Sequence, residues 1–213
     1  MTVYFDNAAT TRVSDEAAQL MMDVMTRQYG NPSSTHKMGR DAKAVLDTAR
    51  KHAANAIAAQ PSEIYFTSGG TEADNWAVFM GAKKAGHHGR HFITSKTEHG
   101  AVLNCAEKLQ EAGWTVTYLT QDKSGRITVE EFSKALTPET SLVSIMLVNN
   151  ETGAVNDIAA MAKLLHGNNK NAIFHTDAVQ GLFKVPFTAR LLGADLISLS
   201  SHKIHGPKVC CAL

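Results

Sequence analysis

Short apolar segments alternate with longer amphipathic segments through most of the chain. The apolar segments are rich in β-branched and aromatic residues and last only a few positions, which is typical of strands. We therefore predict strands at residues 64–67, 92–94, 115–119, 142–148, 172–174 and 196–199. Amphipathic stretches between them predict helices over residues 71–84, 99–111 and 157–165.

Several predicted strands are apolar at every position rather than at alternate positions. This pattern is typical of a parallel sheet that is covered by helices on both faces. Together with the strand–helix alternation, it predicts an α/β fold with a mostly parallel sheet flanked by helices on both faces. The N-terminal part differs, because helical patterns at 14–28 and 40–59 surround the irregular segment 30–34. We expect an arm or a small flanking region there.

The composition excludes several classes of partner. The 213 residues are 44% hydrophobic and 19% charged, with a net charge of +1, which argues against nucleic acid or an anionic membrane as the main partner. No apolar run approaches the ~20 residues of a transmembrane helix, and the first residues do not resemble a signal peptide. The three cysteines, Cys105, Cys210 and Cys211, are expected to be buried thiols in a protein of the reducing cytoplasm.

Polar residues cluster at the predicted carboxyl ends of strands, where open α/β sheets bind their ligands. Residues 68–72 (Ser-Gly-Gly-Thr-Glu) place glycines before a helix, where free N–H groups and the helix dipole favour a phosphate. A plain tight turn capped by Thr71 is the alternative. Residues 149–153 (Asn-Asn-Glu-Thr-Gly) follow the most hydrophobic strand, either as ligand contacts or as a common Asn-rich turn.

Two further clusters supply a carboxylate and an amine. Asp177 ends a predicted strand and Gln180 follows three residues later, so Asp177 either pairs with a protonated ring nitrogen or caps the next helix. Lys203 follows a buried strand, between residues 200–202 (Ser-Ser-His) and the Gly-Pro turn at 206–207. In a partly desolvated site its lowered pKa makes it a nucleophilic amine, whereas an ordinary surface lysine is the alternative.

Phosphate donors, a partner for a ring nitrogen and an amine nucleophile together describe a site for pyridoxal 5′-phosphate (PLP). This cofactor binds as a Schiff base with a lysine and has an Asp on its ring nitrogen. No single cluster indicates PLP, but the combination does. The histidine-rich segment 87–91 is expected to be a solvated loop, because a metal site requires converging ligands, and we predict no metal.

Seven motifs occur in order along the whole chain and make its family recognisable. They are YFDNAAT (4–10), GNPSSTHKMGRDA (30–42), TSGGTEADN (67–75), TEHGAVLN (97–104), VNNETG (148–153), HTDAVQ (175–180) and SSHKIHGPK (200–208). The set closely resembles the NifS/IscS-like cysteine desulfurases of the class V aminotransferase fold.

The resemblance implies a role for each matched residue. Lys203 corresponds to the Schiff-base lysine, and His99 to the histidine that stacks on the pyridine ring and helps in proton transfer. Asp177 corresponds to the partner of the ring nitrogen, and Gln180 to the neighbour of the phenolic oxygen. Asn150 corresponds to the asparagine near the cofactor oxygen and the substrate carboxylate. The predicted phosphate end of the cofactor site comprises Gly70, Thr71, Ser200, Ser201 and His202.

The resemblance also implies a domain organisation and a reaction. Residues 1–30 would form an N-terminal arm and helix, and residues 31–213 a PLP-binding large domain that lacks the family's small C-terminal domain. The implied enzyme is a cytoplasmic homodimer that converts L-cysteine to L-alanine. It passes the sulfur as a persulfide to an enzyme or acceptor thiol, with a sulfur-acceptor or scaffold protein as partner, for iron–sulfur or other thio-cofactor assembly. The alternatives are another class V enzyme, such as a selenocysteine lyase or an aminotransferase, and a non-catalytic fragment or binding module.

Two departures from the family pattern carry expectations of their own. Val209 and Cys211 stand where family members have glycines, so the local backbone is expected to differ. None of the three cysteines matches the family's sulfur-accepting cysteine, which follows later in those chains together with an arginine for the substrate carboxylate. We therefore expect this chain alone not to turn over L-cysteine at a useful rate. We also expect residues 209–213 to end as an unpaired strand.

Overall fold

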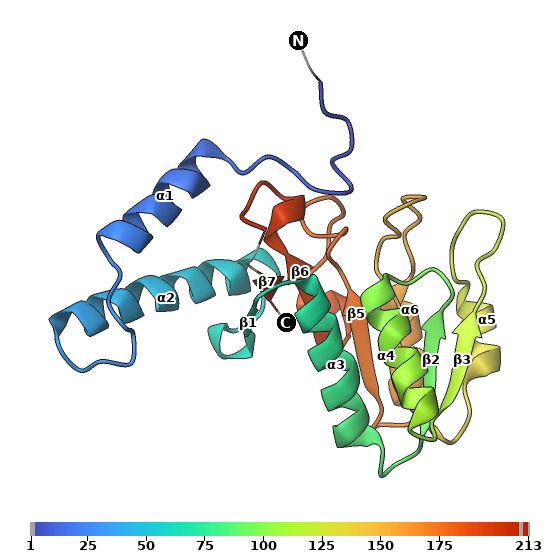
Figure 1. Cartoon of the computed structure of the whole chain (residues 1–213). Helices are drawn as coiled ribbons and strands as arrows, with labels where there is room; N and C mark the ends of the chain where they lie inside the picture. The colour runs from blue at the N-terminus through green and yellow to red at the C-terminus, as the bar shows by residue number, and fades with distance from the viewer. Residues whose placement is uncertain (1–2, 209–210, 213) are drawn as a thin grey trace.

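A central sheet organises the computed structural model, which describes residues 3–208 and 211–212. In this part of the chain the sheet has seven strands in the order β1-β7-β6-β5-β4-β2-β3 (Figure 1). Its parallel strands are β2 (His91–Ser95), β3 (Thr115–Leu119), β4 (Thr140–Ser144), β5 (Ile173–Asp177) and β6 (Leu196–Ser200). The short strands β1 (Phe66–Thr67) and β7 (Cys211–Ala212) pair antiparallel. The predicted mostly parallel sheet is confirmed.

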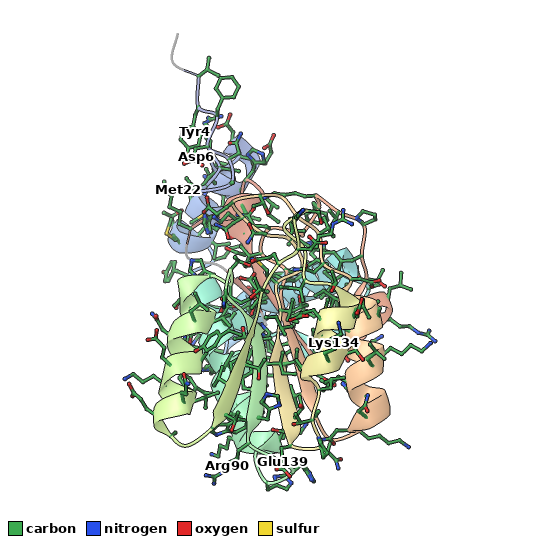
Figure 2. The ribbon with its side chains drawn as sticks, turned by 90° about the vertical axis from the view of Figure 1, so that its right-hand side faces the viewer. Tyr4, Asp6, Met22, Arg90, Lys134 and Glu139 are labelled. Atoms are coloured by element: carbon green, nitrogen blue, oxygen red, sulfur yellow. The ribbon has the colours of Figure 1, made fainter. Side chains whose placement is uncertain are left out.

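Helices cover both faces of this sheet, as the two views show (Figures 1 and 2). On one face lie α3 (Gly70–Ala85) and α4 (Gly100–Glu111), and on the other lie α5 (Val129–Ala135) and α6 (Ile158–Asn168). Phe92 and Leu142 pack into the α3–α4 layer, whereas the next residues, Ile93 and Val143, pack into the α5–α6 layer. Because consecutive strand residues point to opposite faces, a sheet covered on both sides needs strands that are apolar at every position.

Most of the predicted elements are present, and the differences have local causes. The strand predicted at 142–148 is β4, which ends at Ser144. Beyond it the buried chain still bonds to β5, Ile145 N to His175 O at 3.2 Å and Leu147 N to Asp177 O at 2.8 Å. Four short elements were missed: α5, α7 (Ala189–Leu192) and two 3-10 turns (Pro61–Glu63 and Ser201–Lys203). The longest of them spans seven residues, too few for a helical repeat to stand out.

The N-terminal region reaches away from the sheet (Figure 1). Helix α1 (Asp15–Thr26) buries none of its residues, and α2 (Lys37–Ala56) buries only Gly39, Ala42 and Ala54. Ser14 caps α1 by accepting a hydrogen bond from Ala17 N at 3.1 Å. A domain boundary near residue 30 stays a prediction. No helix in the described part of the chain combines the length and apolar character needed to cross a membrane.

The predicted unpaired strand near the end of the chain is wrong for the residues described there. β7 lies between β1 and β6, with Ala212 opposite both Phe66 and Leu199. Antiparallel partners on both sides occupy its backbone, so β7 is not an edge. The predicted burial of Cys105 is confirmed at 1% exposure. Val209, Cys210 and the side chain of Cys211 lie outside the described residues, so the expectations for them stay predictions.

Candidate active site

A cavity of about 520 Å³ opens at the carboxyl ends of the central strands. Asp177 at the end of β5 and Ser200 at the end of β6 form part of its wall. Asp6 of the N-terminal arm lies at this end of the molecule, whereas Arg90 and Glu139 lie at the opposite end of the sheet (Figure 2). The cavity therefore lies where ligands bind in open α/β folds. The predicted site residues that line it are Gly70, Thr71, His99, Asn150, Asp177, Gln180, Ser200, His202 and Lys203.

The first turn of α3 forms one end of the cavity. The helix begins after Gly69, and no side chain caps it, so the alternative that Thr71 serves as the N-cap is wrong. A Cβ added to Gly70 meets only Val179 Cγ2, at 3.5 Å, so the surrounding protein does not fill the space beside this turn. The uncapped N–H groups and the positive end of the helix dipole both favour a bound anion at this turn. This turn can therefore hold a phosphate group.

His202 faces the same region from the loop after β6. Its Nδ1 lies 3.2 Å from Thr10 Oγ1. Burial lowers the pKa of His202, and the positive charges of Lys203, Lys208 and Lys184 lower it further. Near neutral pH the imidazole is therefore uncharged, so one of its ring nitrogens donates a hydrogen bond and the other accepts one. Neutral donors of this kind, together with the α3 turn, suit a phosphate.

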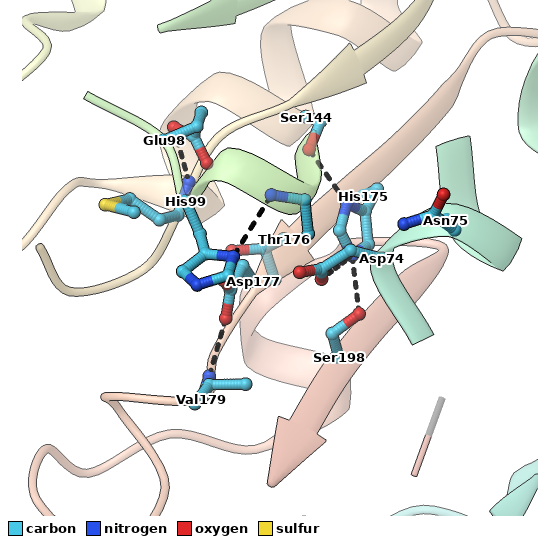
Figure 3. A network of polar contacts seen from close by, with 12 residues as sticks. Asp74, Asn75, Glu98, His99, Ser144, His175, Thr176, Asp177, Val179 and Ser198 are labelled. Atoms are coloured by element: carbon cyan, nitrogen blue, oxygen red, sulfur yellow. Dashed lines mark hydrogen bonds and ion pairs between the residues drawn. The ribbon is translucent and has the colours of Figure 1, made fainter. Parts of the chain in front are cut away.

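Asp177 is the last residue of β5, and its carboxylate forms part of the cavity wall close to His99 (Figure 3). Its Oδ1 accepts a hydrogen bond from Val179 N at 2.9 Å. Burial raises the pKa of Asp177, whereas the Val179 N–H and the positive charges of His99 and Lys203 lower it. The segment after β5 forms turns rather than a helix, so the alternative that Asp177 caps a helix is wrong. Because this buried carboxylate does not cap a helix, it is available to pair with a cationic ring nitrogen.

Lys203 lies in a 3-10 turn (Ser201–Lys203) directly after β6. Its Nζ donates hydrogen bonds to the main-chain oxygens of Ala8 at 2.5 Å and Ala9 at 2.8 Å. Burial lowers the pKa of this amine, whereas the negative charges of Asp177 and Asp6 raise it. A lowered pKa increases the fraction of neutral amine, which is the nucleophilic form. Lys203 is thus a tethered, partly desolvated amine rather than an ordinary surface lysine.

The N-terminal arm holds the lysine loop in place, a role that the sequence did not reveal. Thr11 N donates to His202 O at 2.8 Å, and His205 N donates to Thr11 Oγ1 at 2.7 Å. Ser14 N adds a bond to His205 O at 2.9 Å. These contacts join segments almost 200 residues apart. The only signal for them was the N-terminal motif YFDNAAT, which matched the family without indicating a contact.

His99 caps helix α4 and also lines the cavity. Its Nδ1 accepts a hydrogen bond from Ala101 N at 3.1 Å. A nitrogen that accepts a backbone N–H carries no proton itself, so the neutral ring holds its proton on Nε2. The cap therefore fixes both the tautomer and the orientation of a histidine at the cavity wall.

Two amide side chains complete the wall, and Ser201 does not belong to it. Gln180 Nε2 donates to Ala8 O at 2.8 Å, while its Oε1 accepts from Lys184 Nζ at 2.6 Å. Asn150 lines the cavity.

Ser201 is absent from the lining; its Oγ donates to Pro207 O at 2.5 Å, so its place in the cofactor site stays a prediction. Gly206 passes so close that a Cβ there would lie 2.6 Å from Ser201 Cβ.

The Asn-rich turn is confirmed at Asn149, whereas a ligand contact by the neighbouring Asn150 stays a prediction. Asn149 organises the turn, because its Oδ1 accepts from Glu151 N at 3.1 Å and from Thr152 N at 2.9 Å. Its neighbour Asn150 lines the cavity and donates to Glu151 Oε1 at 2.6 Å. Because Asn149 makes the hydrogen bonds that hold the turn, Asn150 is available to contact a ligand.

A buried polar layer lies directly beneath the cavity, and sequence analysis missed most of it (Figure 3). Its members are Asp74, Glu98, Ser144, His175 and Ser198. Asp74 of α3 also lines the cavity. It follows Gly70 by four residues, and this helical spacing places both on one face of α3, which was the signal available in the sequence.

In the part of the chain that the structure describes, neither a metal site nor a reactive thiol lies beside this cavity. Among the described residues, no group of three or more His, Cys, Asp and Glu side chains is arranged to hold a metal ion. Burial raises the pKa of Cys105 to about 11, and the negative charge of Asp74 adds to the effect. Because the thiolate is the nucleophile, Cys105 is inert near neutral pH.

The donor set of the cavity fits PLP. The uncapped α3 turn, with Ser200 and His202 opposite, matches the phosphate; Asp177 matches the ring nitrogen; and Lys203 matches the aldehyde. These groups lie at one end of one sheet and face a single cavity. The residues that line the cavity therefore have the donors that this cofactor would need.

Comparison with known proteins identifies the family. Residues 3–211 match the model of the family described as Aminotransferase class-V, and the chain belongs to that family. The resemblance to the NifS/IscS-like cysteine desulfurases is also confirmed. The chain is 45% identical over 211 residues to the cysteine desulfurase IscS of Methanosarcina thermophila, covering 99% of this chain and 52% of that protein. It is 44% identical to IscS of Escherichia coli O139:H28, covering 98% of this chain and 52% of that protein.

Solved structures show the same fold. A NifS-like protein superimposes with a TM-score of 0.96 at 40% identity, covering all of this chain and 58% of the other. A structure of SspA in complex with cysteine gives a TM-score of 0.91 at 35% identity, covering 99% of this chain and 60% of the other. The chain thus spans about half the length of the curated relatives that it matches.

Proposed function

We propose that this chain is the cofactor-binding part of a PLP-dependent cysteine desulfurase. One observation carries the proposal: Lys203, Asp177 and the uncapped first turn of α3 converge on one cavity at the carboxyl ends of the strands. Similarity to proteins named cysteine desulfurase, and to SspA solved with cysteine, supports L-cysteine as the substrate. The cytoplasmic location, the homodimer and a sulfur-acceptor or scaffold partner belong to the same proposal.

The roles of the chain's own residues follow from their positions. When bound, PLP would supply an electron sink for the substrate carbon next to the amino group. Asp177 would hold a negative charge against the ring nitrogen and so keep that nitrogen protonated. Lys203 Nζ would hold the cofactor through its aldehyde carbon and would take and return protons beside the substrate. The neutral His99 ring carries its proton on Nε2, and this imidazole would stack on the cofactor ring.

The remaining residues of the cavity wall would contact the substrate carboxylate, the phenolic oxygen and the phosphate. Asn150 would donate to the substrate carboxylate through its side-chain amide, and Gln180 would lie near the phenolic oxygen. Gly70, Thr71, Ser200 and His202 would hold the phosphate. In the sulfur-transfer step, an external thiolate attacks the substrate sulfur, the carbon–sulfur bond breaks, and the carbon takes a proton to give alanine. The products are alanine and a persulfide on the attacking thiol.

A turnover assay tests this proposal. The chain and a version that carries the coding sequence downstream of residue 213 are supplied with PLP, L-cysteine and a thiol reductant. We expect alanine and sulfide in equal amounts from the longer version, and none from its Lys203→Ala variant. Residues 1–213 alone should release little alanine, because placement of a thiolate near the substrate sulfur can supply about 7–11 kcal/mol of barrier lowering.

Two outcomes would overturn the proposal. Equal turnover by the longer version and its Lys203→Ala variant would exclude Lys203 as the reactive amine. Alanine release from selenocysteine but not from cysteine would assign the site to a selenocysteine lyase instead.

A further inference from the structure

Asp74 is a buried carboxyl group at the floor of the cavity that the proposed mechanism does not use. It is 2% exposed, and it lies one helical turn below Gly70 on α3. Among the described residues its Oδ1 has no hydrogen-bond partner. The nearest ion-pair candidate is His175 Nε2, 3.7 Å from Oδ1, which is too long for a hydrogen bond. A polar atom left in this way within a protein interior calls for an explanation.

His175 does not provide a positive charge for Asp74. The imidazole is fully buried in β5, and both of its nitrogens are already bonded to hydroxyl groups: Nδ1 to Ser144 Oγ at 2.8 Å and Nε2 to Ser198 Oγ at 2.9 Å (Figure 3). Burial lowers the pKa of His175 to about 3. The ring is therefore neutral near pH 7, and an ionised Asp74 would face it without compensation.

The titratable groups around Asp74 include two further carboxyl groups, Asp177 and Glu98. Strand β5 contributes His175 and Asp177, and the segment before α4 contributes Glu98 and His99. Helix α4 contributes Cys105, and the turn after β6 contributes Lys203. The cation of this set, Lys203, acts on Asp177 rather than on Asp74. Burial raises the pKa of Asp74 well above its usual range, and the negative charge of Asp177 raises it further, whereas a bond from Ser198 lowers it.

Two adjacent buried carboxylates cannot both ionise at low cost, so a proton stays on the one that has no cation nearby. Asp177 has an N–H donor and a cation beside it, and it faces the cavity. Asp74 has hydroxyl and imidazole neighbours. We propose that Asp74 is a positioning residue that works in its protonated form: it anchors the first turn of α3 over the His175–Ser198 pair and leaves Asp177 as the ionised carboxylate beneath the cavity. The link to PLP rests on the proposed function.

The proton on Asp74 has two consequences for the cavity. A neutral carboxyl group can donate one hydrogen bond and accept others, which suits a layer of hydroxyls and a neutral imidazole. It also adds no negative charge behind the turn that would hold the phosphate. An ionised Asp74 in the same place would weaken phosphate binding and would raise the pKa of Asp177.

Two substitutions separate the proton from the carboxylate. Asp74→Asn keeps the shape and the donor but cannot ionise, so we expect its affinity for PLP to stay within about threefold of the unmodified chain. Asp74→Ala removes the anchor, and we expect it to weaken PLP binding by about tenfold, since buried partners lose their bonds. Asp157→Asn, an exposed helix cap, is the matched control for removing an Asp charge, and we expect it to leave PLP binding unchanged.

A measurement on the chain without cofactor completes the test. The carboxyl carbons of Asp74 and Asp177 are followed by ¹³C NMR between pH 4 and pH 9 and assigned with Asp74→Asn and Asp177→Asn. We expect Asp74 to stay protonated at pH 7 and Asp177 to be ionised. Ionised Asp74 at pH 7, or equal loss of PLP affinity in Asp74→Asn and Asp74→Ala, would overturn the inference. Absence of PLP binding with a protonated Asp74 would overturn the proposed function while leaving the protonation of Asp74 standing.

Discussion

The two ends of the parallel strands each bury a histidine, and the pair shows what distinguishes packing from function. Each imidazole is held between hydroxyl groups on neighbouring strands. His91 at the amino end contacts Thr140 Oγ1 at 2.7 Å and Thr117 Oγ1 at 2.8 Å. His175 near the carboxyl end contacts Ser144 Oγ at 2.8 Å and Ser198 Oγ at 2.9 Å. In both places the hydroxyls satisfy a neutral ring that burial has deprived of water.

The difference between the two ends lies in the carboxyl groups. Burial alone lowers the pKa of His91, and no carboxylate of the described residues pairs with its ring. Around His175 lie Asp74, Asp177 and Glu98, of which two retain an oxygen without a partner in the described structure. The hydroxyl-bound histidine is therefore a structural device found at both ends. Among residues 3–208, the additional buried carboxyl groups, which cost folding free energy, occur only next to the cavity.

The largest expected effect comes from the carboxylate that faces the cavity. Asp177→Ala should lower the turnover of the longer version by about 10²–10³-fold, because a charge aimed at the reacting system is lost. Its free energy of unfolding should fall much less, since Asp177 accepts only one backbone bond. Turnover and urea unfolding measure the two quantities. A variant with normal turnover and a normal cofactor spectrum would assign Asp177 another role.

Replacing each histidine by alanine tests whether the two ends differ in function. Both variants should lose about 2–4 kcal/mol of unfolding free energy, because each leaves buried hydroxyls unsatisfied and a cavity behind. Only His175→Ala should also weaken PLP binding, by about tenfold, whereas His91→Ala should bind PLP as the unmodified chain does. Urea unfolding and PLP titration give the two numbers. Equal loss of PLP affinity in both variants would remove the distinction.

A pH dependence of stability is expected from the carboxyl-end layer. Burial raises the pKa of Glu98 to about 8, while the bonds from Ser95 and Met146 oppose the shift. Between its ordinary value of 4.5 and about 8, the folded state holds a proton that the unfolded state releases. Stability therefore falls as the pH rises through this window, with a slope of up to about 1.4 kcal/mol per pH unit.

His175 acts in the opposite direction at lower pH. Its pKa falls from 6.5 to about 3, so the unfolded state binds the proton and stability rises with pH between these values. The two slopes oppose each other between 4.5 and 6.5, and the decline due to Glu98 should be visible between pH 6.5 and 8. Urea unfolding of Glu98→Gln should show a flatter curve in that range. An unchanged slope would mean that Glu98 does not carry the proton.

The smallest effect is expected at the buried thiol. Cys105 has a pKa raised to about 11 by burial, so it should react with iodoacetamide far more slowly than a free thiol at pH 8. Intact mass followed over time measures the rate, and the unfolded chain in urea serves as the control. Equal rates in the folded and unfolded chain would contradict the buried position of Cys105.

The sequence predicted the elements whose signal is local. The strands predicted at 92–94 and 196–199 and the helix predicted at 99–111 depend on neighbours within a few residues, and the structure contains them as β2, β6 and α4. Strand-end placement also predicted eight of the nine site residues that line the cavity, because parallel strands bring their carboxyl ends together, whereas His99 came only from the family resemblance. Ser201 is not part of the lining, its hydroxyl bonds to Pro207 O, and its place in the cofactor site stays a prediction.

Features that depend on distant segments were not predictable in this way. The contact of Ala8 and Ala9 with Lys203 joins residues 195 and 194 positions apart, and nothing in the small arm residues indicates it. The pairing of β7 between β1 and β6 likewise depends on three separated segments, so the apolar end of the chain looked like an open edge. Asp74 was detectable only by its helical spacing from Gly70.

Mapping the cofactor's attachment point tests the central claim most directly. The chain is incubated with PLP, reduced with borohydride and digested, and the peptides are sequenced by mass spectrometry. We predict a pyridoxyl group on Lys203 and none after Lys203→Ala, with Lys208→Ala as the matched control that keeps the adduct. Attachment to Lys208, or an adduct that survives in Lys203→Ala, would contradict the assignment of this cavity as a PLP site.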